Sequence, residues 1–210
     1  MDESIDPAEA GRRLLLVGPP VYDPARLAEQ LDAALAVGDI AGFVLPVDDA
    51  LDDPVARLAP LQTLCAHHAT AFIVRDHLEL ALEMGADGVH LGSAAGDVAA
   101  ARAALGKERI LGVSCGVSRH AAMVAGEQGA DYVAFGDPAR RPGPEVDELL
   151  GWWSELCVLP CVAEGAITVQ DCTRLARAGA DMVAVGQDVW TDPAGAAAVV
   201  RRFRDALRAA

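Results

Sequence analysis

The phrase GADGVHLG occupies residues 85–92, and near copies return as GADYVAFG at residues 129–136 and GADMVAVG at residues 179–186. Each copy follows a run typical of a helix and continues into three or four residues typical of a strand, which end in glycine. Glycine adopts positive φ without a Cβ clash, so it suits the left-handed residue that closes a helix. We therefore predict positive φ at the first glycine of each copy, with a strand following it.

The copies begin 44 and 50 residues apart, roughly twice the length of one strand-plus-helix unit. An unmarked unit is therefore expected between consecutive copies, and short apolar runs supply its strand at both places. A weaker form of the phrase, GDIAGFVLP, begins at Gly38 and predicts a further strand. The predicted strands number eight, at residues 14–18, 43–47, 71–74, 85–91, 110–114, 129–135, 161–165 and 179–185.

Alternating strands and helices predict a parallel sheet that helices cover. Eight such units in about 200 residues favour a single closed (βα)8 TIM barrel over an open doubly wound sheet. Thr168, with Asp171 three residues on, predicts one helix start. Asp192 before Pro193 predicts the start of the last helix. That helix should bury the stripe Val199, Val200, Phe203 and Leu207. In such barrels the chemistry lies on the loops at the C-terminal ends of the strands.

Composition bounds the class of protein. A chain of 210 residues with 52% hydrophobic content can bury one core, so we expect a flexible segment at residues 1–12 and one domain at residues 13–210. The net charge of −14 makes nucleic acid an unsuitable partner. No stretch of 18 apolar residues or secretory signal is found, so a cytoplasmic protein without a membrane partner is expected. Five cysteines without a C-x-x-C pair indicate buried thiols.

At the strand ends the sequence resembles the thiamine-phosphate synthase and thiazole tautomerase family over nearly the whole chain. The phrases GADGVHLG, ILGVS, GADYVAFG, VAEGAIT and GADMVAVG resemble the landmarks of that family in the same order. The resemblance implies a barrel that binds a thiazole phosphate, a small phosphorylated heterocycle. In the synthase it also implies the joining of this thiazole to a pyrimidine, whose diphosphate leaves with magnesium assistance.

The resemblance also shows where this chain departs from the family pattern after strands two to four. Synthases present Gln, Arg and Lys after strand two, where this chain has Val44, Pro46 and Asp48. The Asn-Asp pair after strand three becomes Arg75 and Asp76, which leaves Asp76 as one magnesium ligand in an incomplete site. After strand four the expected acidic position is Ala95, and Asp97 would have to act from a shifted place.

The later strand ends keep part of the pattern. Ser114 matches the serine of the family, and Asp137 stands where the tautomerase branch carries its histidine base, so these two are the candidate catalytic residues. Arg140 and Arg141 replace a Thr-rich loop that ends in Lys, and with Arg75 they are candidate phosphate ligands. Backbone amides at the ends of strands seven and eight are the other phosphate candidates, at Gly165, Ala166, Gly186 and Gln187.

Each candidate also has a purely structural interpretation. Asp76 could be a helix N-cap, Asp137 a loop cap, and the loop arginines solvated charges. His90 is expected to face the barrel interior as a hydrogen-bonded core histidine. The Trp152-Trp153 pair indicates either packing or a contact between subunits of a homo-oligomer.

Three functions stay open at this point. The first is thiamine-phosphate synthesis, which needs a cluster of cations to stabilise the departing diphosphate. The second is a tautomerase or isomerase acting on a thiazole phosphate, with Asp137 or Asp76 as its base. The third is a non-catalytic ligand-binding or regulatory relative. The missing cations favour a thiamine-pathway barrel with a degenerate synthase site.

Overall fold

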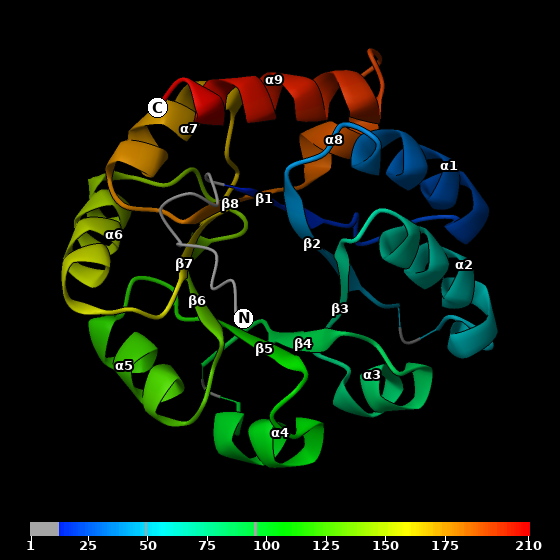
Figure 1. Ribbon diagram of the computed structural model, residues 1–210, viewed down its shortest axis with the longest axis horizontal. Coiled ribbons are helices and arrows are strands. Elements are labelled where there is room, and N and C mark those ends of the chain that lie inside the picture. The colour runs from blue at the N-terminus through cyan, green and yellow to red at the C-terminus, as the bar shows by residue number, and fades with distance from the viewer. Residues whose placement is uncertain (1–12, 49, 95) are drawn as a thin grey trace, which may run out of the picture.

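The computed structural model describes residues 13–48, 50–94 and 96–210, so the segment at residues 1–12 lies outside the described residues. Eight parallel strands form a closed barrel in which each strand pairs with its neighbours in sequence order, β1 closing on β8 (Figure 1). This confirms the predicted TIM barrel. The strands are β1 (Arg13–Val17), β2 (Ile40–Pro46), β3 (Ala71–Arg75), β4 (Gly88–Leu91), β5 (Ile110–Ser114), β6 (Tyr132–Asp137), β7 (Cys161–Gly165) and β8 (Met182–Val185).

Helices surround the barrel as an outer ring (Figure 1). Each of the first seven strands is followed by one helix, and β8 is followed by a short helix and then a long one. The helices are α1 (Pro24–Leu35), α2 (Pro54–His67), α3 (Leu78–Met84), α4 (Val98–Leu105), α5 (Arg119–Glu127), α6 (Pro144–Leu156), α7 (Val169–Arg177), α8 (Gln187–Thr191) and α9 (Ala196–Arg208).

The repeated phrase marks the entry into three of the four even strands, β4, β6 and β8. Gly85, Gly129 and Gly179 have φ of 65°, 95° and 114°, which confirms the predicted positive φ. The strands β4, β6 and β8 begin three residues after these glycines. The turn thus takes the same shape at three places in the barrel.

The aspartate of each copy joins the even strand to the odd strand before it. The carboxylate of Asp87 accepts the N–H of Phe72 at 2.7 Å, while the Asp87 N–H donates to the Phe72 carbonyl at 3.0 Å. Asp131 makes the same pair of bonds with Leu111, and Asp181 makes it with Cys161. The repetition of Gly-Ala-Asp therefore reflects one reciprocal clamp between neighbouring strands, used three times.

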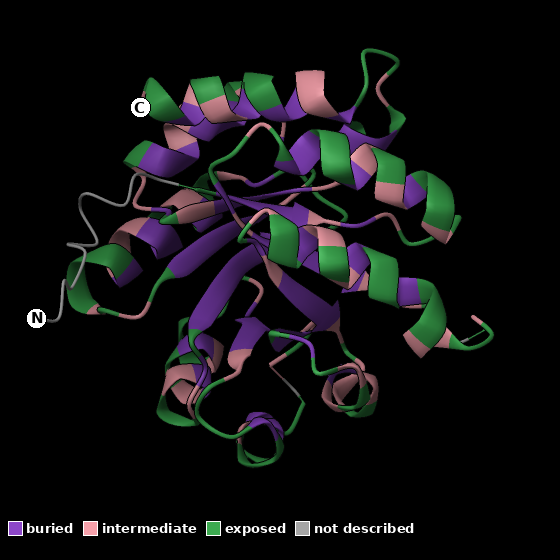
Figure 2. Ribbon diagram, turned by 45° about the vertical axis from the view of Figure 1, so that its right-hand side comes forward, coloured by how far each residue is buried: buried purple, intermediate pink, exposed green. Residues whose placement is uncertain are grey.

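The core consists of two clusters of buried residues. Buried residues lie along the strands and on parts of the surrounding helices (Figure 2). The larger cluster lies between the strands and the inward faces of the helices and includes the predicted α9 stripe. A smaller cluster fills the barrel interior with side chains from alternate strand positions, as expected for this architecture. Its buried members are Leu15, Val44, Ile73, Tyr132, Ala134, Val162 and Ala184.

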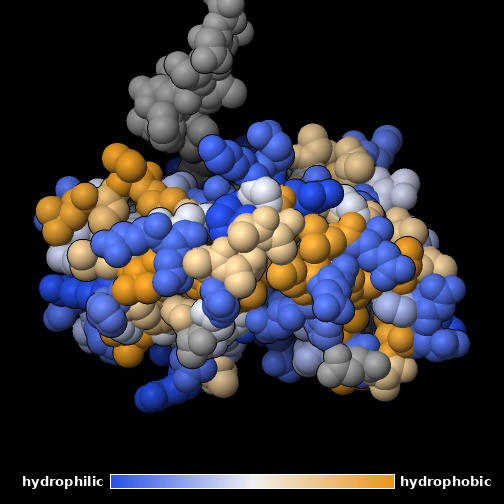
Figure 3. Space-filling model, turned by 90° about the horizontal axis from the view of Figure 1, so that it is seen from below, coloured by the Kyte–Doolittle hydropathy of each residue, from blue (hydrophilic) through white to orange (hydrophobic). Residues whose placement is uncertain are grey.

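Seen from the side on which α4 lies, the molecule shows hydrophilic side chains interspersed with hydrophobic ones (Figure 3).

Trp153 is buried, packs edge-on against Phe135 and donates from Nε1 to the Leu159 carbonyl at 2.7 Å. Trp152 is half-buried, with the Arg119 guanidinium 4.8 Å from its ring centre. Packing therefore accounts for Trp153.

Two helix starts were predicted, and one is wrong. Thr168 is the N-cap of α7, and its N–H donates to the Asp171 carboxylate at 3.0 Å, as predicted. The last helix begins at Ala196 with Gly195 as its N-cap, not at Asp192. The insertion of α8 explains the error, because Asp192 follows that helix and its carboxylate accepts the N–H of Ala194 at 2.8 Å.

All five cysteines are free thiols, and four of them are buried. Among the described residues, no helix is long and apolar enough to cross a membrane.

Candidate functional site

A pocket of about 700 Å³ opens at the C-terminal end of the barrel, beside the ends of β4, β5, β6 and β7. This is the face on which the sequence placed the site. Four of the predicted site residues line it, namely Ser114, Asp137, Arg140 and Arg141. Gly92, Gly116, Gly136 and Glu164 also line it. The remaining predicted site residues lie outside its lining, namely Arg75, Asp76, Gly165, Ala166, Gly186 and Gln187.

A chain of buried polar side chains crosses the barrel beneath this pocket. The Tyr132 hydroxyl lies 2.8 Å from Nδ1 of His90, and Nε2 of His90 lies 2.9 Å from Oγ of Ser114. Oγ of Ser114 in turn donates to Oε2 of Glu164 at 3.0 Å. All four residues are at most 5% exposed. Four consecutive strands, β4 to β7, thus contribute one residue each to the chain.

Only one direction of donation satisfies every member of this chain when Glu164 is ionised. Ser114 donates to the carboxylate, so its oxygen accepts from Nε2–H of His90, and Nδ1 accepts from the Tyr132 hydroxyl. Burial, reinforced by the charge of Arg75, lowers the pKa of His90 to about 3. The imidazole is therefore neutral near neutral pH, which agrees with this tautomer. The prediction of a hydrogen-bonded core histidine is confirmed.

Glu164 was not among the residues singled out from the sequence. Its Oε1 is buried and has no hydrogen-bond partner among the described residues. Burial raises the pKa of Glu164 to about 7, although the Ser114 hydrogen bond and the charge of Arg75 act in the opposite direction. The available signal was a glutamate at an inward position of the apolar strand CVAEG, since such a carboxyl must find a partner or change its pKa.

Replacing Glu164 with Gln should change how stability depends on pH. The Glu164 carboxyl holds its proton more tightly in the folded chain than in the unfolded chain, where its pKa is about 4.5. The free energy of unfolding of the wild type should therefore fall as pH rises from about 4.5 to about 7, by about 3 kcal/mol from this group. Gln cannot ionise, so the free energy of unfolding of Glu164→Gln does not carry this pH dependence. Its difference from the wild-type value should therefore become more favourable to the variant as pH rises from about 4.5 to about 7.

Urea unfolding at several pH values measures this difference. Glu29→Gln, at an exposed position of α1, is the matched control and should follow the wild-type curve. Parallel curves for Glu164→Gln and the wild type would contradict a raised pKa at Glu164.

Arg75 and Asp76 lie at the rim of the pocket, next to Gly92. The Gly92 N–H donates to Oδ1 of Asp76 at 2.6 Å, and Nε of Arg75 lies 3.4 Å from Oδ2. A Cβ at Gly92 would lie 2.9 Å from the Arg75 guanidinium. The N-cap of α3 is His77, so Asp76 is not its cap. Asp76 itself has a φ of 61°. The turn after β3 thus directs the Asp76 carboxylate toward the β4 end.

The residues after β3 and β4 do not fit a magnesium ion held by the protein. Both carboxylate oxygens of Asp76 already have a partner, and Asp97 caps α4 by accepting the N–H of Ala100 at 2.8 Å. Ala95 lies outside the described residues. Within residues 13–48, 50–94 and 96–210, no three His, Cys, Asp or Glu side chains are grouped to hold a metal ion.

The positions after β2 offer no cation. Val44 is buried in the barrel interior, and the Pro46 carbonyl accepts from the Tyr22 hydroxyl at 3.1 Å. Asp48 is exposed, and its carboxylate accepts the N–H of Ala50 at 2.9 Å. The end of β2 therefore presents two apolar residues and one acidic residue, and none of the three can supply a positive charge.

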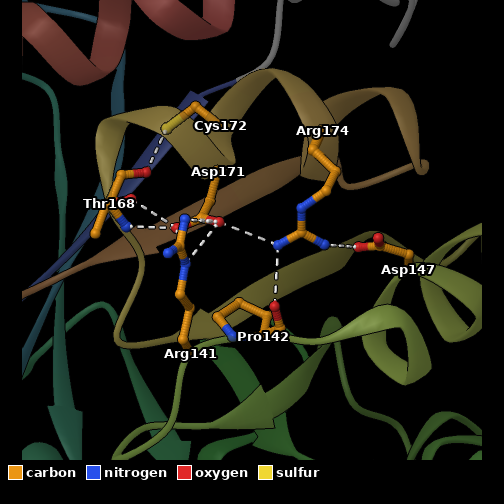
Figure 4. A network of polar contacts seen from close by, with 7 residues as sticks. All are labelled: Arg141, Pro142, Asp147, Thr168, Asp171, Cys172 and Arg174. Atoms are coloured by element: carbon orange, nitrogen blue, oxygen red, sulfur yellow. Dashed lines mark hydrogen bonds and ion pairs between the residues drawn. The ribbon is translucent and has the colours of Figure 1, made fainter.

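Arg141 is held by a carboxylate of the neighbouring helix (Figure 4). Its Nε lies 3.0 Å from both oxygens of Asp171, which also lies 3.2 Å from Nη2 of Arg174. Arg174 donates further to the Pro142 carbonyl and pairs with Asp147. Burial acts to raise the pKa of Asp171, but the hydrogen bonds from Arg141, Thr168 and Arg174 outweigh it and lower the pKa to about 2. Arg141 thus fastens the β6–α6 loop to α7.

The same loop covers the end of β7. The Ala166 N–H donates to the Arg140 carbonyl at 2.9 Å, so this amide already has an acceptor. A Cβ at Gly165 would lie 2.6 Å from that carbonyl oxygen. At the end of β8, Gly186 is the N-cap of α8 and Gln187 is its first residue. The β6–α6 loop therefore covers the β7 half of the predicted backbone phosphate site, which distinguishes it from the β8 half.

Arg140 and Asp137 project from the exposed part of this loop. The Arg140 side chain is exposed and forms no ion pair with any described residue. Asp137 is exposed, and its Oδ1 accepts the N–H of Ala139 at 2.9 Å, which is the geometry of a loop cap. Arg140 is thus a cation at the pocket that is available to a ligand.

Comparison of the sequence with known proteins shows the family of this chain. The family model described as thiamine monophosphate synthase matches residues 14–189. A thiamine-phosphate synthase of Rhodospirillum centenum is 45% identical over 202 residues, covering 93% of this chain and 98% of that protein. One of Erythrobacter litoralis is 45% identical over 195 residues, covering 89% and 90%.

A solved structure supports the fold. The thiamine phosphate pyrophosphorylase from Pyrococcus furiosus superimposes with a TM-score of 0.79 at 23% identity, covering 94% of this chain and 96% of that one. On the family match and these relatives, the chain belongs to the thiamine-phosphate synthase family, a TIM-barrel family of thiamine biosynthesis.

Proposed function

We propose that this chain binds a small phosphate-bearing heterocycle in the pocket at the C-terminal end of its barrel, and that its site for displacing diphosphate has degenerated. The observation that carries the proposal is the β2 end, where Val44, Pro46 and Asp48 stand in place of a polar side chain and two cations. A departing diphosphate needs positive charge or a metal ion beside it, because charge develops on its oxygens as the bond breaks.

The surviving features suit binding. The pocket size is in the usual range for small-molecule sites, and its lining combines apolar residues with polar and charged ones, among them Ser114, Arg140 and Glu164. Arg140 supplies an available guanidinium, and Gly186 opens α8 at the strand end where barrels commonly hold phosphate. Asp171 engages Nε and Nη2 of Arg141, and the side chain, which lines the pocket, is 60% exposed, so Nη1 keeps donors for a ligand.

A tautomerase or isomerase is the second candidate function. It needs a proton-transfer group rather than a cation cluster, and the buried carboxyl of Glu164 favours it. Asp137 and Asp76 are less suited as bases, since a backbone amide already donates to Oδ1 of each and Oδ2 of Asp76 faces Arg75. A ligand-binding relative without catalysis would need only the pocket.

Thermal shift with thiazole phosphate, pyrimidine diphosphate and thiamine phosphate tests the binding proposal. Thiazole phosphate should raise the melting temperature with or without Mg²⁺, and a ligand at 100 times its Kd contributes about 2.7 kcal/mol. The shift should shrink in Arg140→Ala and persist in Arg201→Ala, an exposed arginine of α9. A shift only with pyrimidine diphosphate and Mg²⁺ would contradict the proposal and favour an intact synthase site.

A further inference from the structure

We propose that Glu164 is the proton-transfer residue of this pocket, moving a proton between two atoms of a bound phosphate-bearing thiazole. The inference rests on the proposed function, since it assumes that such a heterocycle enters the pocket. It names a carboxyl on β7 in place of Asp137, which ends β6, and Asp76, which follows β3.

The first support is the position of the free oxygen. Glu164 lines the pocket at its base, while Oε1 is excluded from bulk water and has no hydrogen-bond partner among the described residues. A buried polar atom without a partner is costly, so its presence beside a pocket points to a ligand atom as the missing partner. Gly92, Gly116 and Gly136, which carry no side chain, line the same pocket.

The second support is the chain of donors that holds the other oxygen. Ser114 donates to Oε2, and His90 and Tyr132 complete the chain behind it. Gly112 leaves the space that Tyr132 occupies, because a Cβ there would lie 2.3 Å from the hydroxyl oxygen. The carboxyl is therefore fixed through Oε2 in both protonation states, and Oε1 can gain or lose a proton without rearrangement of the chain. Such preorganisation is what an efficient acid–base group requires.

The third support is the balance of charges around the carboxyl. Arg75 from β3 favours the ionised form, and the charge of Asp137 from β6 opposes it. His90 stays neutral, the pKa of Tyr132 is raised by burial, and burial together with the charge of Glu164 raises the pKa of Cys115 to about 12. Glu164 is thus the member of this group that changes charge near neutral pH, the range in which a general base acts best.

The reaction balances without an oxidant or reductant. Oε1 of ionised Glu164 takes a proton from an alkyl carbon that is attached to the ring and conjugated with its C=N bond. The electron pair of that C–H bond forms a C=C bond to the ring and shifts the ring electrons toward the C=N bond. The neutral carboxyl then returns the proton to another ring atom, which regenerates the carboxylate. The product is a tautomer of the ligand.

Deuterium uptake by thiazole phosphate in D₂O, followed by proton NMR, tests the proposal. The wild type should accelerate exchange at the alkyl carbon attached to the ring, with a rate that rises through an apparent pKa of about 7. Glu164→Gln should lower this rate on the order of 10²-fold or more, while thiazole phosphate still raises its melting temperature. Glu29→Gln should exchange like the wild type.

Ser114→Ala separates positioning from a general loss of fold. Loss of its hydrogen bond should move the apparent pKa of exchange upward, because that bond lowers the pKa of Glu164. Thiazole phosphate could bind while the wild type and Glu164→Gln exchange deuterium at the same rate, or while neither exchanges it. Either result would overturn the role of Glu164 and leave the proposed function standing. Failure of thiazole phosphate to bind at all would overturn the proposed function, and this inference with it.

Discussion

Purified protein given thiazole phosphate, pyrimidine diphosphate and excess Mg²⁺ should form little or no thiamine phosphate. Loss of one electrostatic donor typically costs on the order of 10² to 10³ in rate, so loss of several should lower turnover by at least about 10⁴-fold. The β2 end holds Val44, Pro46 and Asp48, and Asp48 adds a negative charge where the leaving group is negative. Both oxygens of Asp76, the metal ligand predicted from the sequence, already have partners.

The relative from Rhodospirillum centenum, assayed beside this chain, provides the comparison of rates. Pro46→Arg with Asp48→Lys should raise synthesis at least about 10-fold, since it returns two cations to the β2 end. Turnover near that of the relative would overturn the degenerate-site proposal. In that case Arg75, Arg140 and Arg141 would form the diphosphate site, and their replacement by Ala would abolish synthesis.

Gly136→Ala should destabilise the barrel strongly, by about 4 kcal/mol or more. A Cβ at Gly136 would lie 1.9 Å from the Glu164 carbonyl oxygen, a backbone atom of the neighbouring strand, and φ at this position is 133°. Gly136 and Glu164 are register partners in β6 and β7, so the collision can be relieved only by parting the two strands. That movement would also displace the Glu164 carboxyl.

Gly85→Ala is the matched control. Its φ is 65°, and a Cβ there meets nothing within 4 Å. The left-handed conformation alone costs about 1 to 2 kcal/mol for alanine. Guanidinium unfolding followed by circular dichroism measures both variants, and an equal loss in the two would show that the close approach of β6 and β7 is not what requires Gly136.

Local sequence patterns were enough to predict the alternation of strands and helices, and hence the face of the barrel on which the candidate site lies. Both follow from local patterns, since the glycines of the repeated phrase close helices and the apolar runs end where loops begin. Ser114, Asp137 and Arg140 reach the pocket because each follows or ends a strand of a parallel barrel. The function of the aspartate in that phrase was not visible, because its partner lies in another strand.

Which side chains contact one another depends on the packing of the whole barrel. Glu164, Ser114, His90 and Tyr132 are 18 to 74 residues apart along the chain, and the register of four neighbouring strands brings them into one line of hydrogen bonds. The same holds for Arg141, which pairs with Asp171 because the β6–α6 loop lies against α7. Local propensity acts within a few residues, whereas these contacts depend on strand register and barrel closure, which the chain settles only when all eight strands pack together.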